Sequence, residues 1–223
     1  VMDLDRALAF SRYADRVFAV SPALRDEIVA ALDTSFDWTG EDAALDDCID
    51  TGNPVALATA MRRLRRRVFV HSMLRDLTGR ATLVEVVQAV STLAERTLAA
   101  AIAVHTRVLT EAHGRPIGDE TGLAQALVVI GMGKLGGREL NVSSDIDLVF
   151  AYPEDGDTDG QRRISNREFF DRLGQRVIAS ISHVDADGYV FRVDMRLRPY
   201  GESGPLTVSF AALERYLVER LPG

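Results

Sequence analysis

The sequence predicts an α+β fold, in which a helical amino-terminal region (residues 1–120) precedes a small mixed sheet with flanking helices (residues 121–223). Two observations lead to this prediction. In the first half, apolar residues recur at the three- and four-residue spacing of a helix face. In the second half, short extended apolar runs bounded by glycine replace that spacing. The change falls between Gly114 and Ala126, which separates the two regions.

Two proline positions mark helix starts in the first region. Ser21-Pro22 and Asn53-Pro54 each place a capping side chain before a proline at the first helical position. The helix after Asn53 carries an apolar stripe and is expected to stop at Gly79. A second long helix follows, with a stripe that begins at Leu83.

Two apolar runs in the second region predict strands on either side of a glycine-rich loop. Residues 126–130 (ALVVI) form a continuous apolar run of the kind found in buried strands. The glycine-rich residues 131–137 (GMGKLGG) end this run. Residues 146–152 (IDLVFAY) predict the second strand.

The rest of the second region predicts a helix, a strand and a final helix. A capping box at residues 165–168 (SNRE) begins an amphipathic helix. A turn at Asp187-Gly188 leads into a third strand at residues 189–194. Ser209 is expected to cap the last helix.

The composition is that of a soluble globular protein. The 223 residues include 26 Lys and Arg against 33 Asp and Glu, and no apolar run approaches the roughly 18 residues of a membrane span. The single cysteine, Cys48, excludes an internal disulfide and a cysteine-based zinc site. Residues 1–5 are acidic, unlike a secretory signal, and the chain begins at Val1, so we expect a cytoplasmic fragment that binds no membrane.

Paired carboxylates at the second predicted strand indicate a metal site. Asp145 and Asp147 are two residues apart, so on a strand they share a face, while Ile146 and Leu148 point into the core. Two such carboxylates repel unless a cation lies between them, and hard oxygen ligands suit Mg²⁺, with Mn²⁺ as the alternative. Asp194 is the expected third ligand. A carboxylate trio of this kind suits phosphoryl or nucleotidyl transfer.

The glycine-rich loop has the features of a phosphate site. Lys134 and Arg138 supply positive charge, and glycines let backbone N–H groups approach a phosphate closely. Each pattern alone is common, because a D-x-D on a strand is more often a surface alternation and a glycine run is equally a tight turn. The glycines are Gly131, Gly133, Gly136 and Gly137.

The order of these motifs is more specific than any one of them. A strand, G-x-G-K, S-D-x-D-L, a helix and a strand ending in Asp form the layout of the DNA polymerase β-type nucleotidyltransferase superfamily. GMGKLGGRELNVSSDIDL at 131–148 and VDMRLRPYGESGPL at 193–206 further resemble the bifunctional glutamine synthetase adenylyltransferase/adenylyl-removing family. ELNVSS before the aspartates and SFAALERY at 209–216 resemble the amino-terminal, adenylyl-removing domain of that family.

This resemblance implies a nucleotidyltransferase that removes AMP from an adenylylated tyrosine of glutamine synthetase. Inorganic phosphate attacks the adenylyl phosphorus and releases ADP and unmodified glutamine synthetase. The phenolate is a feasible leaving group, because tyrosine ionises near pKa ~10. The implied partners are glutamine synthetase, ADP or ATP, phosphate and, for the full-length enzyme, the nitrogen-signalling PII protein.

The resemblance also implies roles for individual residues. Asp145 and Asp147 bind metal and neutralise charge in the transition state, and Asp194 is the third carboxylate and a candidate base. Arginines at strand ends suit the attacking phosphate or the α-phosphate, and the motifs leave open which of them binds it. The residues expected to bind phosphate groups are Gly133, Lys134, Arg138, Ser144, Arg196 and Arg198.

Two other functions fit the same motifs. One is the opposite activity, adenylyl transfer from ATP to a glutamine synthetase tyrosine. The other is a regulatory nucleotide-binding module that binds metal without turnover, against which the intact carboxylate trio argues. Only the adenylyl-removing enzyme predicts ADP release that depends on phosphate.

Three further patterns are interpreted as structural. Residues 155–160 (DGDTDG) imitate a calcium-binding EF-hand loop, but Asn166 replaces its final Glu and a strand leads into it, so we expect a solvated acidic loop. Residues 62–67 (RRLRRR) are expected to be a solvated, partner-facing helix surface that binds no nucleic acid, because the protein is acidic. The histidines share no spacing and are expected to be structural or surface residues; they are His71, His105, His113 and His183.

Overall fold

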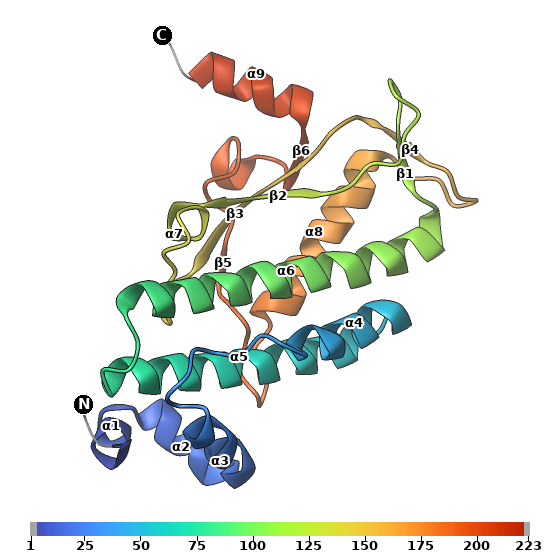
Figure 1. The fold of residues 1–223 in the computed structure, drawn as a ribbon. Coiled ribbons are helices and arrows are strands. Elements are labelled where there is room, and N and C mark those ends of the chain that lie inside the picture. The colour runs from blue at the N-terminus through green and yellow to red at the C-terminus, as the bar shows by residue number, and fades with distance from the viewer. Residues whose placement is uncertain (1–3, 221–223) are drawn as a thin grey trace.

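The computed structural model describes residues 4–220, so the predicted outer bounds of the two regions, 1 and 223, lie outside the described residues. The predicted α+β class is confirmed (Figure 1). The helices are α1 (Leu4–Phe10), α2 (Arg12–Val20), α3 (Pro22–Ala30), α4 (Glu41–Thr51), α5 (Pro54–Leu77), α6 (Leu83–His113), α7 (Gly133–Gly136), α8 (Asn166–Ser182) and α9 (Phe210–Arg220). The strands are β1 (Pro116–Gly118), β2 (Val128–Met132), β3 (Ile146–Tyr152), β4 (Gly156–Thr158), β5 (Val193–Asp194) and β6 (Thr207–Ser209).

The long helices α5, α6 and α8 lie on one side of the sheet (Figure 1). The long helices α5 and α6 lie side by side, and α8 packs against α6 and against β6. The short helices α1, α2 and α3 pack on α5, at the end of the molecule opposite α9. The sheet therefore has a helical layer on one side, while α9 extends from β6 away from that layer.

Both predicted helix starts are confirmed. The side chain of Asn53 accepts hydrogen bonds from the N–H groups of Val55 and Ala56, each over 3.1 Å, at the start of α5. Pro22 begins α3 directly after Ser21, as predicted, but the side chain of Ser21 forms no capping hydrogen bond, so the predicted cap is wrong at this helix. α5 ends two residues before Gly79, which adopts the left-handed conformation (φ +70°) that favours glycine.

α6 is the central helix of the core. By length and composition alone it is apolar enough to cross a membrane, which the short apolar runs of the sequence did not indicate. More than half of its most apolar window is buried inside the protein, where it contacts α4, α5 and α8. Much of its apolar surface therefore packs within the described chain.

A single cluster of buried apolar side chains joins the helical and mixed regions. It runs from Met61 on α5 and Val104 on α6 to Phe150 on β3 and Phe170 on α8. A smaller cluster, which includes Phe18, packs α1, α2 and α3 against α5. The division of the chain into two domains near residue 120 stays a prediction, and the described residues share their main core across it.

His105 links α6 to α8 and makes stability depend on pH. Its Nε2 lies 2.7 Å from Ser180 Oγ, and burial, followed by the charge of Arg176, lowers its pKa from 6.5 to about 4. In the unfolded chain this histidine binds a proton near pH 6.5, whereas in the folded chain it stays neutral until about pH 4. As the pH falls below 6.5, proton binding therefore stabilises the unfolded state relative to the folded one. We expect this effect of His105 to remove about 2 kcal/mol of stability between pH 7 and pH 5.

Urea unfolding at the two pH values tests this prediction. His105→Gln should show a smaller loss of stability between pH 7 and pH 5 than the wild type. The exposed His183 at the end of α8 is the control, because His183→Gln should keep the wild-type loss. The buried His71 has a lowered pKa too and leaves a residual pH dependence in both variants. An unchanged loss in His105→Gln would contradict the assignment.

β3 is the centre of the sheet that carries the predicted site. β2 runs antiparallel to β3 along one edge. β5 and β6 run parallel to β3 and share its other edge, β5 at its beginning and β6 at its end. The prediction of β3 is confirmed with its bounds, whereas β2 starts two residues later than predicted and includes Gly131 and Met132.

The prediction of a strand over residues 189–194 is wrong in extent. Only Val193 and Asp194 pair with β3, as β5. The N–H groups of Val190 and Phe191 instead donate to the carbonyl of Ile181 at the end of α8, over 3.0 and 3.1 Å. The chain therefore packs on a helix before it reaches the sheet.

Ser209 lies in the unpredicted strand β6 and precedes α9 directly. The two other short strands that the sequence did not predict, β1 and β4, pair with each other. Each of these strands has only three residues, and its pairing is defined by a partner more than thirty residues away in the sequence.

The arginine run on α5 is not the solvated surface that we expected. Arg62 is buried and reaches the 183–189 loop, where it donates to the carbonyls of His183 and Gly188 and pairs with Asp185. Further along, Arg66 and Arg67 also form ion pairs, with Asp187 and with Glu27 and Glu41. The expectation fails because the 183–189 loop and the helices α3 and α4 pack against α5 and place carbonyls and carboxylates beside these arginines. Arg63 is the exposed member of the run.

Three of the six residues of the EF-hand-like segment form the strand β4, and the acidic side chains of the segment have separate partners. Asp155 accepts a hydrogen bond from Tyr152 over 2.8 Å, and Asp157 and Asp159 pair with arginines. Asn166 contacts the backbone instead of these carboxylates, because its Nδ2 donates to the carbonyls of Ile117 and Glu154. These contacts hold a β1–β4 ribbon together.

Candidate active site

The two strands β3 and β5 place Asp147 and Asp194 side by side. These residues are direct partners in a parallel pairing, in which neighbouring strands lie about 5 Å apart. The side chain of Asp194 is 16% exposed, and Asp147 is half-buried. Within residues 4–220 the carboxylate of Asp147 accepts no hydrogen bond. The sheet thus holds two carboxylates together, and that of Asp147 has no hydrogen-bond donor among the described residues.

Gly133 begins the short helix α7, which replaces most of the predicted glycine-rich loop, and lies against Asp147. Met132, the last residue of β2, pairs with Asp147 on β3, so the chain turns directly beside this carboxylate. Gly133 has φ +53°, and a Cβ there would lie 3.1 Å from Asp147 Oδ2. Glycine suits both the backbone conformation and the close approach. The next residue, the exposed Lys134, is the only lysine in the sequence.

Arg192 pairs with Asp145 at the start of β3. Its Nε donates to Asp145 Oδ1, and its Nη2 donates to the carbonyl of Ser143 over 3.0 Å. The carbonyl of Arg192 accepts from the N–H of Ile146 over 2.9 Å, which fixes the backbone of Arg192 beside β3. The sequence analysis did not single out Arg192. Its position two residues before Asp194 was the available signal, because residues two apart in an extended segment share a face.

Arg196 pairs with Asp194 at the end of β5. The guanidinium donates to Oδ2 from Nη2 over 2.5 Å and from Nε over 2.8 Å, and Nε also lies 3.1 Å from Oδ1. The backbone N–H of Arg196 donates to Oδ1 as well. These hydrogen bonds, the side-chain ones first, lower the pKa of Asp194. A carboxylate with a lowered pKa stays ionised at neutral pH, which suits a ligand better than a base.

The remaining predicted phosphate residues have structural contacts of their own. Ser144 Oγ lies 3.0 Å from Asn141 Oδ1 in the turn before β3. Arg138 lies against α6, where it contacts Thr92 and Glu95. Arg198 donates to the carbonyls of Met195, Glu202 and Gly204 and so holds the loop after β5. Phosphate binding by these three residues stays a prediction.

The donor set suits a hard divalent cation. Asp147 and Asp194 supply carboxylate oxygens at paired positions, and Asp145 is a third carboxylate close in sequence. No three acidic, histidine or cysteine side chains converge as a metal-binding group within residues 4–220, and Asp145 is held by Arg192. Two of the three predicted ligands are thus paired on adjacent strands, whereas Asp145 is held by Arg192, and metal binding by the three stays a prediction.

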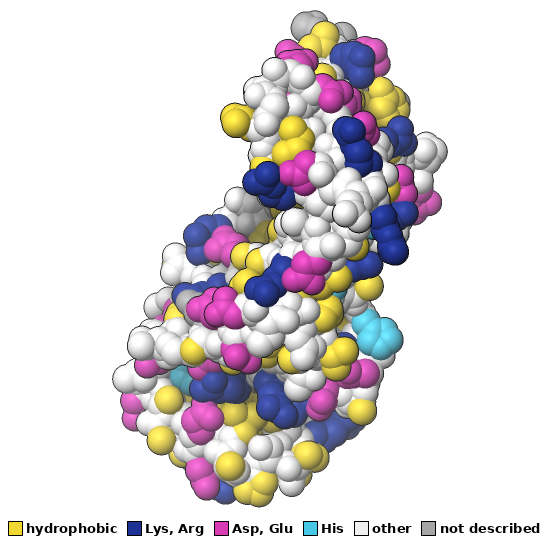
Figure 2. Space-filling view, turned by 90° about the vertical axis from the view of Figure 1, so that its right-hand side faces the viewer, with side chains coloured by type: hydrophobic (Ala, Val, Ile, Leu, Met, Phe, Trp, Pro, Cys, Tyr) yellow, Lys and Arg dark blue, Asp and Glu magenta, His cyan; other side chains and the backbone are white. Residues whose placement is uncertain are grey.

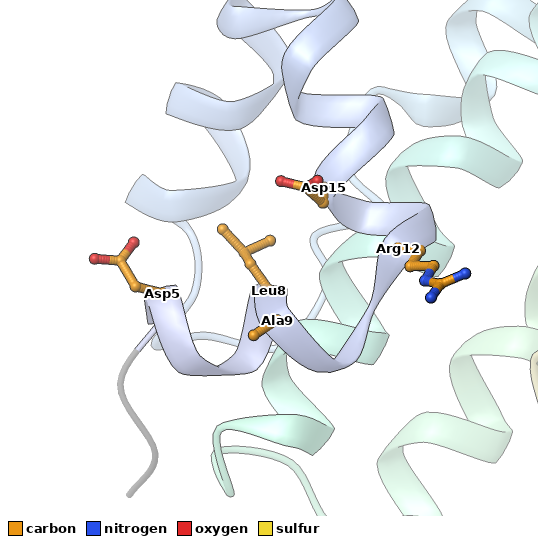
Figure 3. Close-up of a pocket in the computed structure, with 5 residues that line it drawn as sticks. All are labelled: Asp5, Leu8, Ala9, Arg12 and Asp15. Atoms are coloured by element: carbon orange, nitrogen blue, oxygen red, sulfur yellow. The ribbon is translucent and has the colours of Figure 1, made fainter.

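Charged side chains are also found on the surface away from β3 and β5. On the face in Figure 2, basic and acidic side chains are interspersed, in keeping with the many ion pairs of the described residues. A cavity of about 360 Å³ on α1 and α2 is lined by Asp5, Arg12 and Asp15 (Figure 3). Asp5 and Arg12 point in opposite directions there, so no charged groups converge on a common point.

Comparison with known proteins agrees with this geometry. The family described as glutamate-ammonia ligase adenylyltransferase matches residues 1–220, and glutamate-ammonia ligase is another name for glutamine synthetase. A bifunctional glutamine synthetase adenylyltransferase/adenylyl-removing enzyme of Chromobacterium violaceum is 51% identical over 216 residues, which cover 96% of this chain and 24% of that protein. The enzymes of the same name from Nitrosomonas europaea and Pseudomonas aeruginosa are 46% and 51% identical, over 95% and 78% of this chain and 23% and 18% of theirs.

The chain therefore spans about a quarter of the length of the curated relatives that it matches most fully. The match with the family extends over both the helical region and the sheet, including all three aspartates of the site. The chain belongs to the glutamate-ammonia ligase adenylyltransferase family.

Proposed function

We propose that this chain removes AMP from an adenylylated tyrosine of glutamine synthetase by phosphorolysis. The observation that carries the proposal is the pairing of Asp147 with Asp194 on adjacent strands, beside Gly133 and Lys134. Paired carboxylates next to a glycine turn and a lysine suit chemistry at a phosphoryl group. The relatives' names include both adenylyl transfer and adenylyl removal. The choice of removal rests on the resemblance to the amino-terminal domain of that family.

We further propose that Asp147 and Asp194, joined by Asp145, hold a divalent cation, Mg²⁺ or Mn²⁺. When bound, such a cation polarises the phosphoryl oxygens and stabilises the developing negative charge of the leaving phenolate. The ion pairs of Asp145 with Arg192 and of Asp194 with Arg196 orient the two carboxylates, one just before β3 and the other at the end of β5. Asp194 serves as a ligand here rather than as a base, because its pKa is lowered.

The reaction requires an in-line exchange at the adenylyl phosphorus. An oxygen of inorganic phosphate forms a bond to the adenylyl phosphorus while the bond between that phosphorus and the tyrosine oxygen breaks. The products are ADP and a phenolate, which then takes a proton from solvent. In this proposal Lys134, which follows Gly133 in the chain, and Arg196, which pairs with Asp194, hold the nucleotide phosphate.

The remaining features of this function are also proposals. The modified protein is glutamine synthetase, and the PII protein is a partner of the longer enzyme. The reaction takes place in the cytoplasm, where glutamine synthetase and phosphate are both present.

Two reactions test the proposed function. In the first, the chain is incubated with adenylylated glutamine synthetase, Mg²⁺ and phosphate, and ADP is measured. In the second, it is incubated with unmodified glutamine synthetase and ATP, and adenylylated product is measured. A variant with Asp145→Asn and Asp147→Asn is the control in both.

The proposal predicts ADP in the first reaction from the wild type alone. Adenylylated product in the second reaction without ADP in the first would identify a transferase and contradict the proposal. Activity in neither reaction, from a chain that binds nucleotide and Mg²⁺, would favour the regulatory module instead.

A further inference from the structure

The ion pair between Arg192 and Asp145 occupies a carboxylate that the proposed cation site needs. Both side chains are largely exposed, Arg192 by 60% and Asp145 by 46%, so the pair is free to open into solvent. Exposed ion pairs contribute little stability, about 0–1 kcal/mol. The pair is therefore a weak competitor for a divalent cation at Asp145.

Opening this pair would leave a guanidinium fixed beside the site. The backbone of Arg192 is held by the hydrogen bond from Ile146, so its side chain must stay near the start of β3. Its Nη1 forms no hydrogen bond with any residue in the range 4–220, even while the pair is closed. An arginine freed here directs N–H donors from the edge of its planar guanidinium, and two of them can bind two oxygens of one phosphate.

We infer that Arg192 binds the entering phosphate of this site, and that a divalent cation at Asp145 releases it for this task. The inference rests on the proposed function and names the residue that recognises its second substrate. The charges agree with it. Three carboxylates (Asp145, Asp147 and Asp194) and three cationic side chains (Lys134, Arg192 and Arg196) are balanced, so one divalent cation leaves two positive charges for a phosphate dianion.

The inference predicts that Mg²⁺ and phosphate bind cooperatively. Mg²⁺ bound to Asp145 frees Arg192 for phosphate, and phosphate bound to Arg192 frees Asp145 for Mg²⁺. Each ligand should therefore strengthen the binding of the other by the same factor, about tenfold. The test is equilibrium dialysis of the 223-residue chain against radiolabelled orthophosphate, with and without Mg²⁺. Mn²⁺ binding without phosphate is measured separately by electron paramagnetic resonance.

Three variants are compared with the wild type. Arg192→Gln should bind Mn²⁺ several-fold more tightly without phosphate, and Mg²⁺ should strengthen its phosphate binding less than about threefold. Arg192→Lys keeps the charge and should restore part of the cooperativity. Arg115→Gln is the control, because it breaks the Arg115–Asp159 pair, whose side chains are similarly exposed (65% and 38%) and lie at the β1–β4 ribbon. It should behave as the wild type.

Wild-type cooperativity in a folded Arg192→Gln variant would overturn the inference, and so would a wild type that binds no phosphate in the presence of Mg²⁺. The result is separable from the test of function. Loss of cooperativity in Arg192→Gln, from a chain that makes no ADP, would refute the phosphorolysis and leave the role of Arg192 standing. Phosphorolysis with an unchanged KM for phosphate in Arg192→Gln would support the proposed reaction and refute the role of Arg192.

Discussion

Asp147→Asn is expected to lower phosphate-dependent ADP formation by about 10³-fold, with the fold intact. Asp147 is the carboxylate that touches the glycine turn and lies beside Asp194, and it accepts no hydrogen bond within residues 4–220. An amide keeps the shape of the side chain but supplies no negative charge to a cation. The loss should therefore appear in kcat, and in Mn²⁺ affinity measured without substrate.

A matched control separates this effect from a general loss of acidic charge. Asp157→Asn changes another strand aspartate, on β4, which has only a 3.6 Å ion pair with Arg163. It should leave ADP formation within about twofold of the wild type. An Asp147→Asn variant that retains a tenth of the wild-type rate would show that the chemistry lies elsewhere.

Arg62→Met is expected to cost about 3 kcal/mol of stability. The guanidinium is buried and donates to the carbonyls of His183 and Gly188, over 3.1 and 3.0 Å, besides pairing with Asp185. Methionine keeps part of the apolar stem but leaves both carbonyls without this donor. For a protein of this size the melting temperature should fall by roughly 8 °C.

Arg63→Met on the same helix is the control for Arg62. Arg63 is exposed, so the substitution should change the free energy of unfolding by less than about 0.5 kcal/mol. Urea unfolding of the two variants gives the comparison. Equal midpoints for Arg62→Met and the wild type would mean that the 183–189 loop does not depend on this contact.

Elements with local signals were predictable from the sequence. Asn53 with Pro54, and Ser165 with Glu168, specify the starts of α5 and α8 through hydrogen bonds within four residues. The alternating and apolar pattern of β3 was equally sufficient. By contrast, β5 and β6 exist because they reach β3 from distant parts of the chain, and the burial of Arg62 depends on a loop over 120 residues away.

The candidate site was predictable to a similar degree. The D-x-D motif located Asp147, and the strand order placed Asp194 beside it. The sequence could not show that Arg138 turns toward α6 or that Arg198 holds its own loop, because both depend on the path of the chain after a turn. Arg192 was missed because the strand was taken as a source of carboxylates alone.

The position of a radiolabel tests the central claim most directly. Adenylylated glutamine synthetase is incubated with the chain, Mg²⁺ and ³²P-labelled orthophosphate, and the nucleotide product is isolated and degraded stepwise. Phosphorolysis by this site predicts ADP that carries the label only in its β-phosphate. Unlabelled AMP would show that water attacks the adenylyl group, which would contradict the account.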